Sequence, residues 1–150
     1  MGGMTRRALV GGALLLLPVV GARAQAGNWL VTSQEASLPV SATSKAGRSI
    51  TRGPAIRQVS PAGTVTANAP FALKVEFAGR GGEKINPATA QVLILRGGNI
   101  NATERLKAYI TANGIDMPNA MVPPGIYVLQ VAVSDAGGRQ SLANIEIEAR

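Results

Sequence analysis

The sequence predicts an all-β fold, an antiparallel sandwich of two sheets over residues 55–150 with one short helix. Three stretches predict it, residues 71–77, 127–133 and 143–147. Apolar and polar side chains alternate along each of them, as they do in a strand with one buried face. Two sheets packed face to face would bury the three apolar rows against one another.

Shorter elements fill the rest of this domain. Residues 56–59 predict a first strand, and residues 60–63 predict a turn that contains Pro and Gly. Residues 90–95 form an aliphatic run that is typical of a strand covered on both faces. Residues 115–122 are expected to be an irregular or edge segment.

Residues 101–113 interrupt the β pattern. Asn101 is a suitable N-cap, and Gly114 is a suitable residue to end a helix. The pattern therefore predicts a short helix across one end of the sandwich. The alternative is that Asn113 and Gly114 form a hairpin turn.

The first 26 residues resemble an export signal. Arg6 and Arg7 precede an apolar run over residues 8–20, and small residues favour cleavage after Ala24 or Ala26. The run is too short to cross a bilayer. The arginine pair favours a twin-arginine signal, with an ordinary secretory signal as the alternative. We expect a periplasmic or secreted protein with no transmembrane segment after cleavage.

Residues 27–54 are rich in Ser, Thr, Ala, Pro and Gly, which predicts a flexible tether. Thr32 and Glu35 have the spacing of a helix capping box. The single tryptophan, Trp29, is followed by Leu30 and Val31. These three residues either fold back onto the sandwich or form a docking segment that binds a partner.

Charge and composition exclude several functions. The formal charge of +7 includes three arginines of the export signal, so twelve basic and eight acidic side chains remain. With one Trp, two Phe and two Tyr and no docking motif, the sequence does not indicate nucleic-acid binding. Because the chain has no Cys and no His, it has no disulfide, thiolate ligand or histidine base.

The remaining candidate groups for chemistry are few. The carboxylates are spread over separate elements, so we expect no enzyme activity and no cofactor. Met117 and Met121 are two soft ligands that suit Cu(I), and the alternative is that they fill the core. Asp135 is expected to cap its own turn, and Glu146 and Glu148 are expected to be solvated.

These patterns resemble bacterial immunoglobulin-like domains. The matching motifs are Ser60-Pro61-x-Gly63, Phe71-x-Leu73-x-Val75-x-Phe77 and Pro124-Gly125-x-Tyr127-x-Leu129-x-Val131. The resemblance implies that Tyr127 forms the tyrosine corner of such domains. Within that class the layout is similar to periplasmic CopC-like copper-binding proteins, whose Cu(II)-binding histidines this chain lacks.

The resemblance says little about function. We expect a non-catalytic exported module that binds or supports another cell-envelope component, protein or polymer. The alternative is a periplasmic copper-handling protein, with Met117 and Met121 as ligands. A pull-down with and without residues 27–54 tests the first hypothesis, which loses its support if neither version retains a partner.

Overall fold

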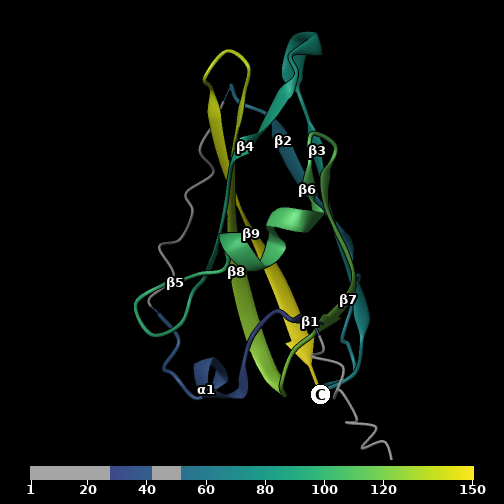
Figure 1. Cartoon of the computed structure of the whole chain (residues 1–150), viewed down its shortest axis with the longest axis vertical. Coiled ribbons are helices and arrows are strands. Elements are labelled where there is room, and N and C mark those ends of the chain that lie inside the picture. Colours follow the sequence, from purple (N-terminus) through teal and green to yellow (C-terminus); the bar gives the residue numbers. More distant parts are fainter. Residues whose placement is uncertain (1–27, 42–51) are drawn as a thin grey trace, which may run out of the picture.

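The computed structural model describes residues 28–41 and 52–150 and shows a sandwich of two β-sheets, as predicted. The predicted export signal and residues 42–51 of the predicted tether lie outside the described residues. The five-stranded sheet has the order β1 (Asn28–Trp29), β7 (Gly114–Met121), β3 (Phe71–Ala78), β2 (Ala55–Ser60), and β6 (Ile110–Thr111) also pairs with β7. The four-stranded sheet has the order β5 (Ile100–Asn101), β4 (Ile85–Ile94), β8 (Gly125–Asp135), β9 (Gln140–Ala149). In Figure 1 the four-stranded sheet lies on the left and the five-stranded sheet on the right.

The core lies between the two sheets and follows the predicted apolar rows. Along β8 the inward side chains are no more than 1% exposed, and the inward rows of its neighbour β9 and of β3 in the opposite sheet are buried as well. These rows are Tyr127, Leu129, Val131 and Val133 on β8, Leu73, Val75 and Phe77 on β3, and Ile145 and Ile147 on β9. Strict alternation along each strand therefore placed the core correctly.

Tyr127 forms the predicted corner. Its hydroxyl lies 2.9 Å from the carbonyl oxygen of Pro123 and 3.1 Å from that of Pro124, so its single proton donates back to the residues just before β8. Burial raises the pKa of the Tyr127 hydroxyl above its ordinary value. The ring thus fixes the Pro-Pro-Gly bend to the start of the central strand.

The helix predicted over residues 101–113 is wrong in extent. α2 spans only Thr103–Leu106, and a 3-10 turn, η2 (Lys107–Tyr109), follows it. The N-cap residue is Ala102 and not the predicted Asn101, although the Asn101 side-chain oxygen accepts a hydrogen bond from the Thr103 amide at 2.9 Å. The alternative, a hairpin, is present instead, because β6 pairs with β7. Its turn lies one residue earlier than predicted, at Ala112 and Asn113, and Gly114 begins β7.

Residues 115–121 belong to a full strand, β7, with the predicted irregularity limited to a register shift against β3 and with an outer edge that is only partly paired. β7 pairs with β3 along its length, and its other edge receives β6 at one end and β1 at the other. Gly114 allows β7 to pack closely against β3, because a Cβ atom at this position would lie 1.8 Å from the Val75 carbonyl oxygen and the backbone has φ +141°.

The predicted burial of residues 90–95 on both faces is wrong, since Leu93 is only half-buried and Gln91 is exposed.

The tether predicted over residues 27–54 is wrong for the part that the structure describes. Residues 28–41, here called the N-terminal segment, include β1 and a single helical turn, α1 (Ser33–Ala36), with the predicted capping box of Thr32 and Glu35. Gly53 and Pro54 are buried. The N-terminal segment is therefore part of the sandwich.

Val65 and Gln58 cover the outer edge of β9 near the end of the strand. Val65 donates a backbone hydrogen bond to the Glu148 carbonyl at 2.8 Å and accepts one from Arg150 at 3.1 Å. The Gln58 side chain donates to the Glu146 carbonyl at 3.1 Å. The two sheets are joined along this side by backbone and amide contacts.

Candidate functional site

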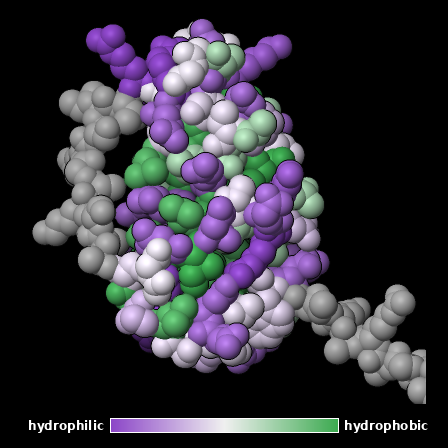
Figure 2. Space-filling model, turned by 60° about the vertical axis from the view of Figure 1, so that its left-hand side comes forward, coloured by the Kyte–Doolittle hydropathy of each residue, from purple (hydrophilic) through white to green (hydrophobic). Residues whose placement is uncertain are grey.

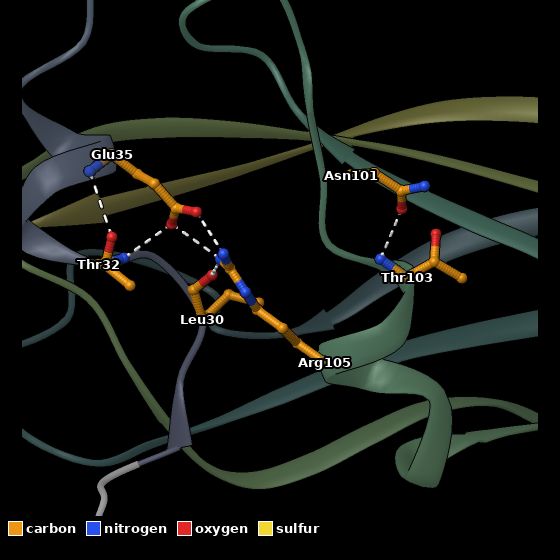
Figure 3. Close-up of polar contacts among 6 residues, drawn as sticks. All are labelled: Leu30, Thr32, Glu35, Asn101, Thr103 and Arg105. Carbon is orange, nitrogen blue, oxygen red and sulfur yellow. Dashed lines mark hydrogen bonds and ion pairs between the residues drawn. The ribbon is translucent and has the colours of Figure 1, made fainter.

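Arg105 on α2 holds the N-terminal segment, as Figure 3 shows. One Nη atom donates to the Leu30 carbonyl at 3.0 Å and to the Glu35 carboxylate at 2.8 Å, and the other Nη atom binds the second carboxylate oxygen. Glu35 also accepts from the Thr32 amide at 3.0 Å. Such a two-pronged arginine–carboxylate pair adds directional specificity to charge attraction.

The ion pair is partly shielded from water. The Glu35 side chain is 15% exposed and that of Arg105 is 32% exposed. The hydrogen bond from Arg105 lowers the pKa of Glu35 below its ordinary value, and the same contact raises the pKa of Arg105. Both groups are therefore charged at neutral pH, and the segment is held by an ion pair.

Arg96, two residues after the end of β4, provides a second anchor that involves no carboxylate. Its Nη1 donates to the carbonyls of Ala36 at 2.8 Å and Leu38 at 3.0 Å, and its Nη2 donates to the Ile126 carbonyl at 2.9 Å. The guanidinium carbon lies 4.8 Å from the centre of the Tyr127 ring, a cation–π distance. Arg96 thus ties the end of the N-terminal segment to the tyrosine corner.

The three residues of the predicted docking segment differ in their exposure. Leu30 and Val31 have 0% exposure and belong to the core, so they fold back onto the sandwich and are not a docking segment. Trp29 is half-buried and pairs with Met121 in parallel register. Of the three residues, only Trp29 has surface left to offer to a partner.

The two methionines do not converge. Met117 is 2% exposed and points into the core beside Leu73. The register between β3 and β7 shifts between Met117 and Ala120, so that Ala120 points inward and the next residue, Met121, points to the outer side. The four-residue spacing therefore does not place both sulfur atoms on one face of the strand.

The carboxylates behave largely as the sequence suggested. Asp135 caps its own turn by accepting from the Arg139 amide at 2.9 Å and from the Arg139 Nε at 3.0 Å. Within residues 28–41 and 52–150, no three His, Cys, Asp or Glu side chains come together in a way that could hold a metal ion. No helix of the described residues is long and apolar enough to cross a membrane.

The outer side of the four-stranded sheet carries exposed apolar side chains, and we call it the apolar face. Ile126 on β8 is 54% exposed and Leu142 on β9 is 46% exposed. Half-buried Leu93 and Val128 also occupy outward positions, because their strand neighbours point inward. The polar pair Gln130 and Asn144 lies on the same side, between Ile126 and Leu142. Figure 2, which brings this side forward, shows hydrophobic side chains down the middle with hydrophilic ones around them.

The N-terminal segment extends the apolar face at one end. Val40 is 62% exposed and forms a β-bridge with Arg96, and Leu38 is 38% exposed beside Gly97. Acidic side chains border the apolar face on β9, where Glu146 is the cross-strand neighbour of Val128 and Glu148 is the cross-strand neighbour of Ile126. The face is thus apolar with a negatively charged margin.

The outer side of the five-stranded sheet, the charged face, is different. Arg57 and Glu76 form an ion pair at 2.6 Å between β2 and β3, and Lys74 faces Asp116 across β3 and β7. Lys74, Glu76 and Asp116 line a hollow of about 540 Å³. Its charges alternate in sign, so this face has solvated pairs rather than one apolar surface.

Two packed sheets with a buried tyrosine corner define the described part of the chain as an immunoglobulin-like β-sandwich. The fold is similar to that of the crystal structure of CopC from Methylosinus trichosporium OB3b, with a TM-score of 0.40 and 16% sequence identity over 63% of this chain and 93% of that one. No protein-family model matches the chain, and no curated protein matches it in sequence.

Proposed function

We propose that this chain is an exported, non-catalytic immunoglobulin-like module that binds or supports another protein of the cell envelope through its apolar face. The observation that carries the proposal is that four exposed large apolar side chains, Ile126, Leu142, Val40 and Leu38, lie on or beside the outer side of one sheet. An apolar centre with a polar margin is the usual composition of a protein–protein contact.

The charge of the margin indicates which partner suits the face. Glu146 and Glu148 stand beside the apolar centre, and Glu148 forms an ion pair with Arg150 at 2.6 Å. Carboxylates at this position oppose direct contact with an anionic polymer or lipid surface. They favour a protein surface that is apolar and carries cations opposite β9.

Copurification from envelope extracts tests this function. The protein is expressed in cells that export it, cross-linked and isolated as native chain, as the double variant Ile126→Glu, Leu142→Glu, and as Val59→Glu. Val59 is a matched control, because it is 38% exposed but lies on β2 of the other sheet. We expect the double variant to lose the partner and Val59→Glu to keep it, with unchanged thermal melting in all three. Equal recovery of the same partner by the double variant would overturn the proposal.

A further inference from the structure

The outer edge of β7 is bound at one end by a short, separate piece of chain. β1 pairs with Ala120 and Met121, and the Leu30 amide donates to the Met121 carbonyl at 2.9 Å. β6 covers Gly114 and Ile115 at the other end. Among the described residues no strand pairs with this edge of β7 from Asp116 to Asn119.

Nearly all the contacts that hold the N-terminal segment are made with residues far away in sequence. The Arg105 bond to Leu30 joins residues 75 apart, and the Arg96 bond to Ala36 joins residues 60 apart. Backbone bonds from Ser41 to Leu95, at 3.0 Å, and from Gly97 to Pro39, at 2.9 Å, add to them. The segment's own hydrogen bonds stay within α1 and its caps. The rest of the sandwich therefore provides a complete binding site for residues 28–41.

The chain that follows the N-terminal segment does not hold β1 against its partner strand β7. β1 runs parallel to β7, so no tight hairpin joins the two strands. Ten residues, 42–51, separate the N-terminal segment from Arg52, and ten residues reach up to about 35 Å when extended. A second copy of the chain carries the same segment on a link of the same length.

We propose that this edge of β7 is a strand-exchange site, which accepts residues 28–41 of a second copy of the chain in place of its own. The site must fit that occupant, because it already binds the identical sequence: Leu30 and Val31 at 0% exposure, and Glu35 on Arg105. Exchange of an identical element makes a dimer without new contact chemistry. The attached segment has a high effective concentration, which keeps the dilute protein monomeric.

Charge reversal across the Arg105–Glu35 pair tests the exchange. In Glu35→Lys and in Arg105→Glu, each chain carries a segment that its own site repels. In a mixture of the two, exchange restores an opposite-charge pair at both sites. We expect light scattering to show a 1:1 heterodimer in the mixture only, and the double variant Glu35→Lys, Arg105→Glu in one chain to be monomeric.

The exposed pair Glu104 and Lys107 is the matched control, since it lies on and beside the same short helix and its side chains are 83% and 74% exposed. A mixture of Glu104→Lys and Lys107→Glu should remain monomeric. If both control and test mixtures dimerise equally, general charge attraction explains the result and the proposal fails.

A peptide experiment covers the case in which one variant folds poorly. A fluorescent peptide of residues 28–41 should bind Glu35→Lys protein at least about tenfold more tightly than native protein, because the repelled segment no longer competes. The same peptide with Glu35→Lys should bind neither. A mixture that stays monomeric together with no peptide binding overturns the proposal, whatever the outcome of the envelope copurification.

Discussion

The two outer faces of the sandwich use the same strand geometry for different surfaces. On the charged face, outward positions hold opposite charges on neighbouring strands, as in Arg57 and Glu76. On the apolar face, equivalent positions hold Ile126 and Leu142. Alternation therefore determines which side chains point outward. The polarity of those outward side chains decides whether a face remains in contact with water or suits a partner.

The largest expected effect is on binding at the apolar face. Placing glutamate at both Ile126 and Leu142 should weaken partner binding by about 100-fold, because each substitution puts a charge into a surface that must lose its water. Val59→Glu should change binding less than threefold. Titration of the isolated partner by surface plasmon resonance measures both, and equal losses would remove the distinction between the faces.

Charge at the margin should have a smaller effect. Glu146→Lys with Glu148→Lys should reduce affinity about tenfold at low salt, mainly through slower association, and the difference should shrink as salt is raised. Glu76→Lys, which reverses a charge on the other face, is the control. Association rates at two salt concentrations give the answer, and a gain in affinity would contradict a cationic partner.

Acid should loosen the N-terminal segment, at the end of the apolar face. Arg105 holds the pKa of Glu35 below its ordinary value of 4.5, so the pair's contribution to stability is present above that pH and is lost as pH falls through the lowered pKa. We expect hydrogen exchange in residues 28–41, corrected for intrinsic rate, to accelerate there while β3 keeps its protection. Glu35→Gln should remove this pH dependence, and a uniform loss over both regions would contradict it.

The exposed ion pair on the charged face should contribute little to stability. The side chains of Arg57 and Glu76 are 74% and 44% exposed, and such pairs contribute about 0.2–1 kcal/mol. A double-mutant cycle with Arg57→Ala and Glu76→Ala, measured by urea unfolding, determines the coupling free energy. A coupling above about 2 kcal/mol would mean that this face has a structural role that its exposure does not suggest.

The smallest expected effect concerns the methionines of the five-stranded sheet. Because Met117 points inward and Met121 outward, the variant Met117→Leu, Met121→Leu should leave any Cu(I) binding unchanged and alter stability by less than about 1.5 kcal/mol. Competition against a Cu(I) chelator measures the first quantity. A clear loss of binding would restore the copper-handling alternative.

The parts of the fold that the sequence predicted are those governed by local patterns. Alternation located β3, β8 and β9, and the Pro-Gly bend before Tyr127 indicated the tyrosine corner. The capping box of Thr32 and Glu35 was also readable, because it depends on a spacing of three residues.

The missed parts depend on residues distant in sequence. The N-terminal segment has the composition of a tether, and the two arginines that anchor it, Arg96 and Arg105, lie some 60 to 75 residues away. β7 was missed because Pro118 and a register shift break its alternation. The apolar face could have been noticed as apolar residues at outward positions, such as Ile126 beside Tyr127 and Leu142 beside Ala143.

The cover that Val65 and Gln58 place over the end of β9 limits how these molecules can associate. A bare last strand invites sideways growth of one sheet into the next molecule, and unlimited repetition of that step produces fibres. Here backbone groups at Glu146, Glu148 and Arg150 are already occupied. We therefore expect concentrated protein to form small complexes of defined size rather than filaments.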